Sequence, residues 1–512
     1  MKRLALVLVA LAAVSAVPAA AQDQRPGGVF KAAMIGEPPS LDLHWTTATI
    51  TQQITWHVYE TLYTFDRNFN PMPLLAEGQT VADGGRRYTI RLRHGVKFHN
   101  GKEMTSADVV ASLTRWGRIS TSGKPLWKNV EAVEAKDPYT VMIHLKESSG
   151  VLLVGLARPN NGAVIYPREI AEAAGDNQTK DVIGTGPYRF VEHKPDRHIK
   201  LARFKDYAGR SEAPDGYAGK RTALLDEILF IPVPDVAVRI AGVETGEYHF
   251  AQQIKQDQYD RIKALPGVVP SIIKPSGWST AVFNHKQGLM TDKRLRLAFQ
   301  AALDMEPIMA AGFGNRDFYR LDPGLLYQEQ TAWYTKAGGE LYNQKNRAKA
   351  AALLKEAGYA GQPVRWVTTK EYEWMYKNAL VAKQQLEEAG FKIDLQVVDW
   401  ATLVQRRNKP ELFDVFSTGF GFVSDPAFMT SAQCNWPGWW CHEEKDRLID
   451  GLIKESDPKK RRAMFERIQV LFYEDAGRIK FGDSFTLDIL RKEVRGFKTT
   501  PETFFWNVSL SK

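Results

Sequence analysis

The sequence predicts a mixed α/β protein with two or more lobes, one of them containing a largely parallel sheet. The chain has 512 residues, which is more than a single hydrophobic core usually serves. In its second half, two helical segments end at Gly358 and Gly390, and strand-like stretches follow at residues 364–368 and 393–398. Helices that alternate with strands in this way are typical of α/β lobes with parallel strands.

The first 21 residues have the pattern of an export signal. Lys2 and Arg3 precede an apolar run at residues 4–17, and alanines at positions 19–21 form a small-residue cleavage site. The apolar run is shorter than the roughly 20 residues that cross a bilayer. We therefore expect a signal peptide at residues 1–21, cleaved near Ala21, and a mature protein in the periplasm. An uncleaved N-terminal anchor is the alternative.

The overall composition is that of an ordinary globular protein. Hydrophobic residues make up 44% and charged residues 25% of the chain. The formal net charge of +9 falls to +7 (9 − 2) when Lys2 and Arg3 are removed with the signal. Basic runs such as residues 459–462 are short, which favours solvated helix faces over a nucleic-acid-binding surface.

The only two cysteines, Cys434 and Cys441, enclose a short loop with three tryptophans. In an oxidising compartment, a single pair favours a disulfide, and two free thiols are the alternative. Just upstream, glycines alternate with Phe420 and Phe422, a pattern typical of backbone that a flat group approaches closely. Residues 414–441 therefore combine features of a binding pocket, although a strand followed by a closed surface turn would produce the same pattern.

The chain carries a series of motifs in a fixed order between residues 59 and 304. They read YETLYTFD from residue 59, YTIRLRHGVKFHNGKEMTSADVVASL from residue 88, GTGPYRF from residue 184 and FNHKQGLMTDKRLRLAFQAALD from residue 283. In the second motif, Tyr88, Ile90 and Leu92 alternate as in a half-buried strand, and Thr105 with Asp108 forms a capping box. Together these motifs resemble the extracytoplasmic solute-binding proteins of ABC importers, family 5, the peptide- and nickel-binding class.

The resemblance implies an architecture for the whole mature chain. It is a two-lobed periplasmic-binding-protein clamp (type II, cluster C) with an extra subdomain in lobe I. Lobe I would take residues 22–275 and, after the chain returns, 478–512. The extra subdomain would cover about residues 66–183, and lobe II would be residues 276–477.

The resemblance also implies a function. The protein would bind di- or oligopeptides, or related amine-bearing solutes, by lobe closure, and deliver them to an ABC permease and its ATPase in the inner membrane. It would act as a monomer, not as an enzyme, without cofactor, metal or nucleic acid. An opine, a nickel chelate or haem are alternative ligands. An exported hydrolase is a further alternative, although the sequence contains no GxSxG, HExxH or P-loop pattern.

The resemblance identifies several candidate ligand-binding residues. Asp425 corresponds to the acid that holds the peptide amine, and Trp400, at the end of a predicted strand, to an aromatic residue lining the site. Thr46 and Thr47 correspond to the lobe I loop that touches ligand. A turn acid and a core tryptophan are the structural alternatives for the first two. Neighbouring candidates are Phe420, Gly421, Phe422 and Trp278.

One position departs from the dipeptide-binding relatives. These carry an arginine for the ligand carboxylate on the helix before the motif LEEAGF, whereas residues 372–380 offer only Lys377. A lysine lacks the bidentate fork of a guanidinium, so strict dipeptide specificity is not expected. The same helix carries Tyr372, Trp374 and Tyr376, which predicts an aromatic pocket instead.

Overall fold

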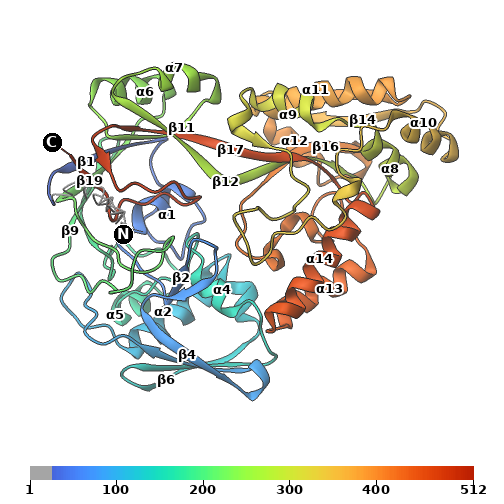
Figure 1. Cartoon of the computed structure of the whole chain (residues 1–512). Helices are drawn as coiled ribbons and strands as arrows, with labels where there is room; N and C mark the ends of the chain where they lie inside the picture. The colour runs from blue at the N-terminus through green and yellow to red at the C-terminus, as the bar shows by residue number, and fades with distance from the viewer. Residues whose placement is uncertain (1–25, 512) are drawn as a thin grey trace, which may run out of the picture.

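The structure is a computed structural model that describes residues 26–511, so the predicted signal peptide lies outside the described residues. Its main sheet has eleven strands. Ten follow the order β15-β14-β16-β12-β17-β11-β1-β10-β9-β8, and β13 pairs with β17 on one side. Helices cover both ends of this sheet, which gives the mixed α/β fold that the sequence predicts (Figure 1).

Two long antiparallel strands join the two lobes. They are β12 (Val268–Phe283) and β17 (Ile479–Arg491), which cross the molecule side by side in Figure 1. Their register shifts between Ile273 and Gly277, in the middle of the crossing. Because the ladder between β12 and β17 is interrupted there, this is a natural place for the lobes to bend. The division expected near residue 275 falls inside β12.

The first lobe combines parallel and antiparallel strands. β1 (Val29–Met34) runs parallel to β10 (Glu227–Pro232) and β11 (Phe250–Ile254). The antiparallel strands β9 (His198–Arg203) and β8 (Tyr188–Lys194) complete that edge. The helices and short strands of this lobe outside the second sheet are α1 (Thr49–Thr55), α6 (Val236–Thr245), α7 (Tyr259–Lys263), β18 (Val494–Arg495) and β19 (Ser509–Leu510).

A second, four-stranded antiparallel sheet lies within residues 66–183. Its order is β4-β5-β7-β6, and helix α2 (Ser106–Ile119) covers it. Both halves of the predicted capping box are present, because Thr105 caps the N3 backbone while Asp108 accepts the Thr105 N–H at 2.8 Å. The remaining elements here are β2 (Tyr63–Phe65), β3 (Pro71–Pro73), β4 (Ala76–Ala82), β5 (Arg87–Leu92), α3 (Gly123–Trp127), β6 (Val130–Asp137), β7 (Thr140–Leu145), α4 (Leu152–Ala157) and α5 (Arg168–Ala174).

The second lobe contains the predicted parallel strands. β14 (Pro363–Thr368) is parallel to both β15 (Lys392–Val397) and β16 (Val415–Gly421). Gly358 and Gly390 follow the ends of the preceding helices with φ of 69° and 105°, as the sequence predicts. The other elements are α8 (Lys293–Ala302), α9 (Met305–Phe313), β13 (Tyr319–Arg320), α10 (Arg347–Glu356), α11 (Glu373–Glu388), α12 (Trp400–Arg406), α13 (Glu443–Lys454) and α14 (Pro458–Glu474).

The local prediction for Trp400 is wrong in one respect. The sequence places it at the end of a strand, but β15 ends at Val397 and Trp400 is the first residue of α12. Asp399 causes the change, because its side chain caps the new helix by accepting the Thr402 N–H at 2.8 Å.

Within residues 26–511, none of the helices combines the length and apolar character that crossing a membrane requires.

Candidate functional site

Two cavities lie along β16 and the segment that follows it. The first, called here the narrow cavity, measures about 80 Å³ and includes Phe422, Val423 and Ser424. The second, the aromatic cavity, measures about 580 Å³ and includes the four residues 418–421. One continuous stretch of backbone therefore borders both cavities.

The narrow cavity is formed between the two lobes. Its lining from the second lobe is Phe422, Val423, Ser424 and Phe428, and from the first lobe Phe65, Phe69, Arg158, Pro159, Asn160, Tyr217 and Glu502. The rings of Phe69 and Phe422 meet across it with centroids 4.5 Å apart. This cavity exists only when the lobes are together.

Two opposite charges face the narrow cavity. Burial lowers the pKa of Arg158, whose guanidinium lies 4.9 Å from the centre of the Phe428 ring. Burial raises the pKa of the Glu502 carboxyl, which accepts a hydrogen bond from Gln52 Nε2 at 2.5 Å. Neither Arg158 nor Glu502 makes an ion pair with another described residue. Each is partly desolvated, and its main source of opposite charge is the other, since Glu502 acts to raise the pKa of Arg158 and Arg158 acts to lower that of Glu502.

Contacts at the end of α13 hold the lobes closed. Gly150 N donates to Ile453 O at 2.9 Å, Ser148 Oγ donates to Lys454 O at 2.9 Å, and Lys454 pairs with Glu147 at 2.8 Å. In Figure 1 the tip of α13 reaches the first lobe at this point. We call residues 147–150 with residues 453–455 the closure contact.

The aromatic cavity belongs almost entirely to the second lobe and the crossing strands. Eight aromatic side chains line it: Trp278, Phe313, Tyr372, Trp374, Trp400, Phe420, Trp436 and Phe485. Several are in ring contact, with centroids 5.0 Å apart for Trp278 and Phe420 and 4.9 Å apart for Tyr372 and Trp400. Arg407 is the only acidic or basic side chain in the lining. Apolar planar surface and one positive charge therefore dominate this cavity.

Strand β16 has an unpaired edge beside the aromatic cavity. β12 pairs with its whole length, but β14 pairs only at Trp366–Val415 and Val367–Phe416. Within the part of the chain that the structure describes, no strand pairs with residues 417–421 on that side. A strand edge of this kind presents backbone N–H and C=O groups to any extended chain that lies against it.

The flat group that the glycine pattern predicts belongs to the protein itself. A Cβ on Gly419 would lie 2.9 Å from the indole of Trp374, so this position requires glycine. At Gly421 the same construction meets no heavy atom within 4 Å. Gly419 thus lets Trp374 of α11 pack closely against the strand, and Gly421 leaves open space beside the cavity.

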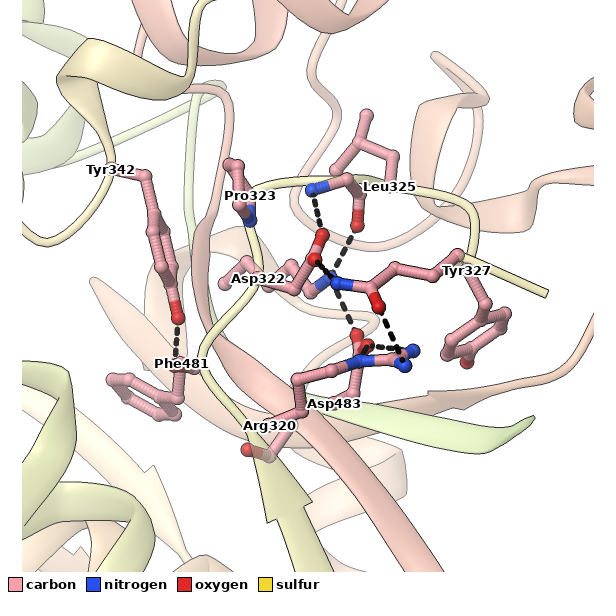
Figure 2. Close-up of polar contacts among 12 residues, drawn as sticks. Arg320, Asp322, Pro323, Leu325, Tyr327, Tyr342, Phe481 and Asp483 are labelled. Atoms are coloured by element: carbon pink, nitrogen blue, oxygen red, sulfur yellow. Dashed lines mark hydrogen bonds and ion pairs between the residues drawn. The ribbon is translucent and has the colours of Figure 1, made fainter. Parts of the chain in front are cut away.

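A buried polar network supports the floor of the aromatic cavity behind β17. Figure 2 shows Arg320 against Asp483, where Arg320 Nε donates to Asp483 Oδ2 at 2.9 Å. The other guanidinium nitrogens of Arg320 bind Glu329, and Gln330 Nε2 donates to Val423 O at 2.8 Å. The loop after β13 therefore fixes both the strand below the aromatic cavity and a residue of the narrow cavity.

Asp425, the predicted amine anchor, lines neither cavity. Its side chain is 1% exposed, and Oδ1 pairs with Arg461 at 2.8 Å and accepts the Ala427 N–H at 2.9 Å. Burial raises the pKa of Asp425 against the opposing effect of Arg461. Oδ2 is buried without a hydrogen-bond partner among the described residues. Its role as anchor stays a prediction, with Oδ2 as the carboxylate oxygen that has no partner in the described part of the chain.

Most other predicted residues do reach the cavities. Trp278, Trp400, Phe420 and Gly421 line the aromatic cavity, and Phe422 lines the narrow one.

Thr46 and Thr47 line neither cavity, but they lie next to one. Thr46 Oγ1 accepts the Ala48 N–H, and Thr47 O accepts a hydrogen bond from Asn160, which borders the narrow cavity.

Sequence reasoning missed the charged residues of both cavities. Arg158, Glu502 and Arg407 stand in stretches without a recognisable motif, and the first two lie far apart in the sequence.

The predicted disulfide is confirmed, since Cys434 and Cys441 are bonded. Of the three tryptophans at this loop, Trp436 lines the aromatic cavity, whereas Trp440 is fully buried.

Comparisons with known proteins agree with this architecture. The family model of the bacterial extracellular solute-binding proteins, family 5 Middle, matches residues 70–438. The oligopeptide-binding protein AppA of Bacillus subtilis is 26% identical over 497 residues, which cover 90% of this chain and 87% of AppA. A probable peptide ABC transporter periplasmic-binding protein of Sinorhizobium fredii, y4tO, is 26% identical over 486 residues, 90% of each chain.

Solved structures share the two-lobed fold. The ABC transporter substrate-binding protein CtaP of Listeria monocytogenes superposes with a TM-score of 0.83 at 23% identity, covering 95% of this chain and 100% of CtaP. Because the family model matches more than half of the chain, this protein belongs to the bacterial extracellular solute-binding proteins, family 5.

Proposed function

We propose that this protein is the periplasmic peptide receptor of an ABC importer. It binds short peptides between its lobes, as a monomer and without catalysis, and presents the closed form to a permease and its ATPase in the inner membrane. The observation that carries this proposal is the unpaired edge of β16 at residues 417–421, which runs beside the aromatic cavity and leads into the narrow one.

An unpaired strand edge recognises the one feature that all peptides share. Main-chain hydrogen bonds to residues 417–421 hold an extended peptide irrespective of its sequence. Side chains on alternate sides of that peptide then point into the neighbouring space, as in any strand. The open space beside Gly421 leaves room for such a side chain.

The narrow cavity accommodates the amino end of the peptide. Glu502 supplies a partly desolvated carboxylate for the ligand ammonium, and Arg158 donates to the adjacent peptide carbonyl. The free Oδ2 of Asp425 is the alternative partner for the ammonium. A ligand that contacts both lobes in this way favours the closed form, because its contacts with one of the lobes are absent in the open form.

Mass spectrometry of small molecules released from the protein tests this function. We expect protein isolated from periplasmic extract to release a heterogeneous set of short peptides on denaturation. The Gly150→Ala variant, whose closure contact is blocked, serves as a matched control that releases few or none. Release of a single non-peptide solute, or hydrolysis of added peptides by the purified protein, would contradict the proposal.

A further inference from the structure

The aromatic cavity contains a positive charge that no acid balances. Arg407 follows α12 and contributes its guanidinium to the lining, with the carbon centre 5.7 Å from the Trp400 ring and 5.4 Å from the Trp436 ring. Its Nε is buried and has no hydrogen-bond partner among residues 26–511. No described carboxylate forms an ion pair with it, and burial lowers its pKa.

Four of the six other arginines that are buried among the described residues are paired with acids. Arg115 pairs with Asp42 at 2.6 Å. Arg296 pairs with Asp475 at 2.9 Å. Burying a guanidinium without a counterion is costly, and the two unpaired examples, Arg239 and Arg478, offset that cost by donating to backbone carbonyls. Arg407 is partly buried, and its guanidinium has neither an acid nor a carbonyl partner among the described residues, inside a cavity that is open to a ligand.

A second arginine raises the positive potential of the same cavity. Arg478 is fully buried, and its guanidinium carbon lies 4.7 Å from the Trp436 ring. It donates to Ser431 O, but it has no acid partner among the described residues. Two guanidinium groups thus lie against Trp436, and the cavity lining contains no carboxylate. An anionic group is favoured here, and a cationic one is disfavoured.

The rest of the lining fixes the shape of the ligand. The eight aromatic side chains provide flat apolar surface, and planar rings pack on such surfaces in stacked or edge-to-face arrangements. A guanidinium binds a carboxylate through two parallel hydrogen bonds while it rests on an aromatic ring. A group that is both aromatic and carboxylate-bearing therefore matches both the aromatic side chains and the guanidinium of this cavity.

We propose that Arg407 is the specificity-determining residue that binds the C-terminal carboxylate of a short peptide whose last side chain is aromatic. This inference rests on the proposed function, because the peptide lies along residues 417–421 with its amino end toward the narrow cavity. Arg407 takes the place of the arginine that α11 lacks, and the aromatic cavity selects the final residue. A cationic last residue, such as lysine, is rejected by Arg407.

Isothermal titration of ligand-free protein with the tripeptide Ala-Ala-Phe tests the proposal. Converting its C-terminal carboxylate to an amide should weaken binding about 10–100-fold, the range for a hydrogen bond to a charged group. Arg407→Gln should weaken binding of the acid by the same factor and leave the amide unaffected. Arg407→Lys should lose part of the affinity, since it keeps the charge without the fork.

Arg406→Gln is the matched control. It removes the same charge from the neighbouring position, where Arg406 binds Gln396 outside the cavity lining. We expect wild-type affinity from this variant, and thermal denaturation of all three variants checks that they are folded.

The outcomes separate the inference from the function on which it rests. If Arg407→Gln binds Ala-Ala-Phe as tightly as wild type, the inference is overturned while peptide binding stands. If no peptide binds but 3-phenylpropionate binds in an Arg407-dependent way, Arg407 keeps its role and the peptide function is overturned. If Ala-Ala-Ala and Ala-Ala-Lys bind as tightly as Ala-Ala-Phe, the aromatic selection is wrong.

Discussion

The two cavities of this protein differ in how they are built. The narrow cavity takes its lining from both lobes, so closure creates it. The aromatic cavity takes nearly all of its lining from one lobe and the crossing strands, so it persists when the lobes separate. The narrow cavity holds opposite charges on Arg158 and Glu502, whereas the aromatic cavity holds Arg407 alone. The comparison indicates an order of events. The aromatic end of the ligand binds first, and lobe closure then completes the cavity that holds the amino end of the ligand.

Blocking closure should affect the two cavities very differently. A Cβ on Gly150 would lie 1.8 Å from Glu455 O, so Gly150→Ala prevents the closure contact without changing either lining. If the closed form falls to about 1%, affinity for a full-length peptide falls about 100-fold, and titration calorimetry measures this loss. Small-angle scattering should report a larger radius of gyration with ligand present.

Weak binding of 3-phenylpropionate should survive in Gly150→Ala, because the aromatic cavity remains. Gly36→Ala is the control, since a Cβ there meets no atom within 4 Å. Unchanged peptide affinity in Gly150→Ala would contradict a role for closure.

Removing the acid of the narrow cavity should have the next largest effect. Glu502→Gln keeps the shape and the contact with Gln52 but loses the negative charge facing the ligand ammonium. We expect peptides with a free amino terminus to bind about 10–100-fold more weakly, and N-acetylated peptides to be unaffected. An equal loss for both peptide forms would show that Glu502 does not contact the ammonium.

Asp425→Asn should change stability more than affinity. In a buried site, Arg461 loses the one acid with which it pairs among the described residues, and breaking such a pair costs about 3 kcal/mol of unfolding free energy. Urea denaturation of the ligand-free protein measures that loss. If peptide affinity falls as strongly as in Glu502→Gln, then Asp425 is the amine anchor after all.

The smallest effect on binding is expected from Asp488, which lies on the crossing strand β17 outside the lining of both cavities. Its carboxyl is buried, and desolvation raises its pKa from 3.8 to about 7, although Gln253 N–H donates to it. The native state therefore holds this proton more tightly than the unfolded state. The resulting stability is present below about pH 4 and is lost as the pH rises through 7.

Unfolding free energy should accordingly fall from pH 5 to pH 8 by on the order of 2 kcal/mol through this group. Asp488→Asn should remove that dependence, as urea denaturation at both pH values can establish, and should leave peptide affinity unchanged. A wild-type pH profile retained in the variant would assign the dependence to another group.

Much of the fold follows from local sequence patterns. The parallel strands beside Gly358 and Gly390, the capping box at Thr105 and the disulfide all appear where they were predicted, because short-range rules govern them. Trp400 is the exception, since a capping aspartate begins a helix where alternation predicted a strand.

For the binding site, the sequence by itself determined the part carried by one lobe. Trp278, Trp400, Phe420 and Gly421 were recognisable because motifs and aromatic clusters mark their positions, and they all line the aromatic cavity.

Only the tertiary structure decided which charges face the ligand. Arg158 and Glu502 are far apart in the sequence and come together within the first lobe, because the C-terminal segment returns to it, and the pairing of Asp425 with Arg461 depends on the packing of α14. The physical reason is that burial and counterions, rather than residue type, decide whether a charge is available. These are properties of the folded chain as a whole.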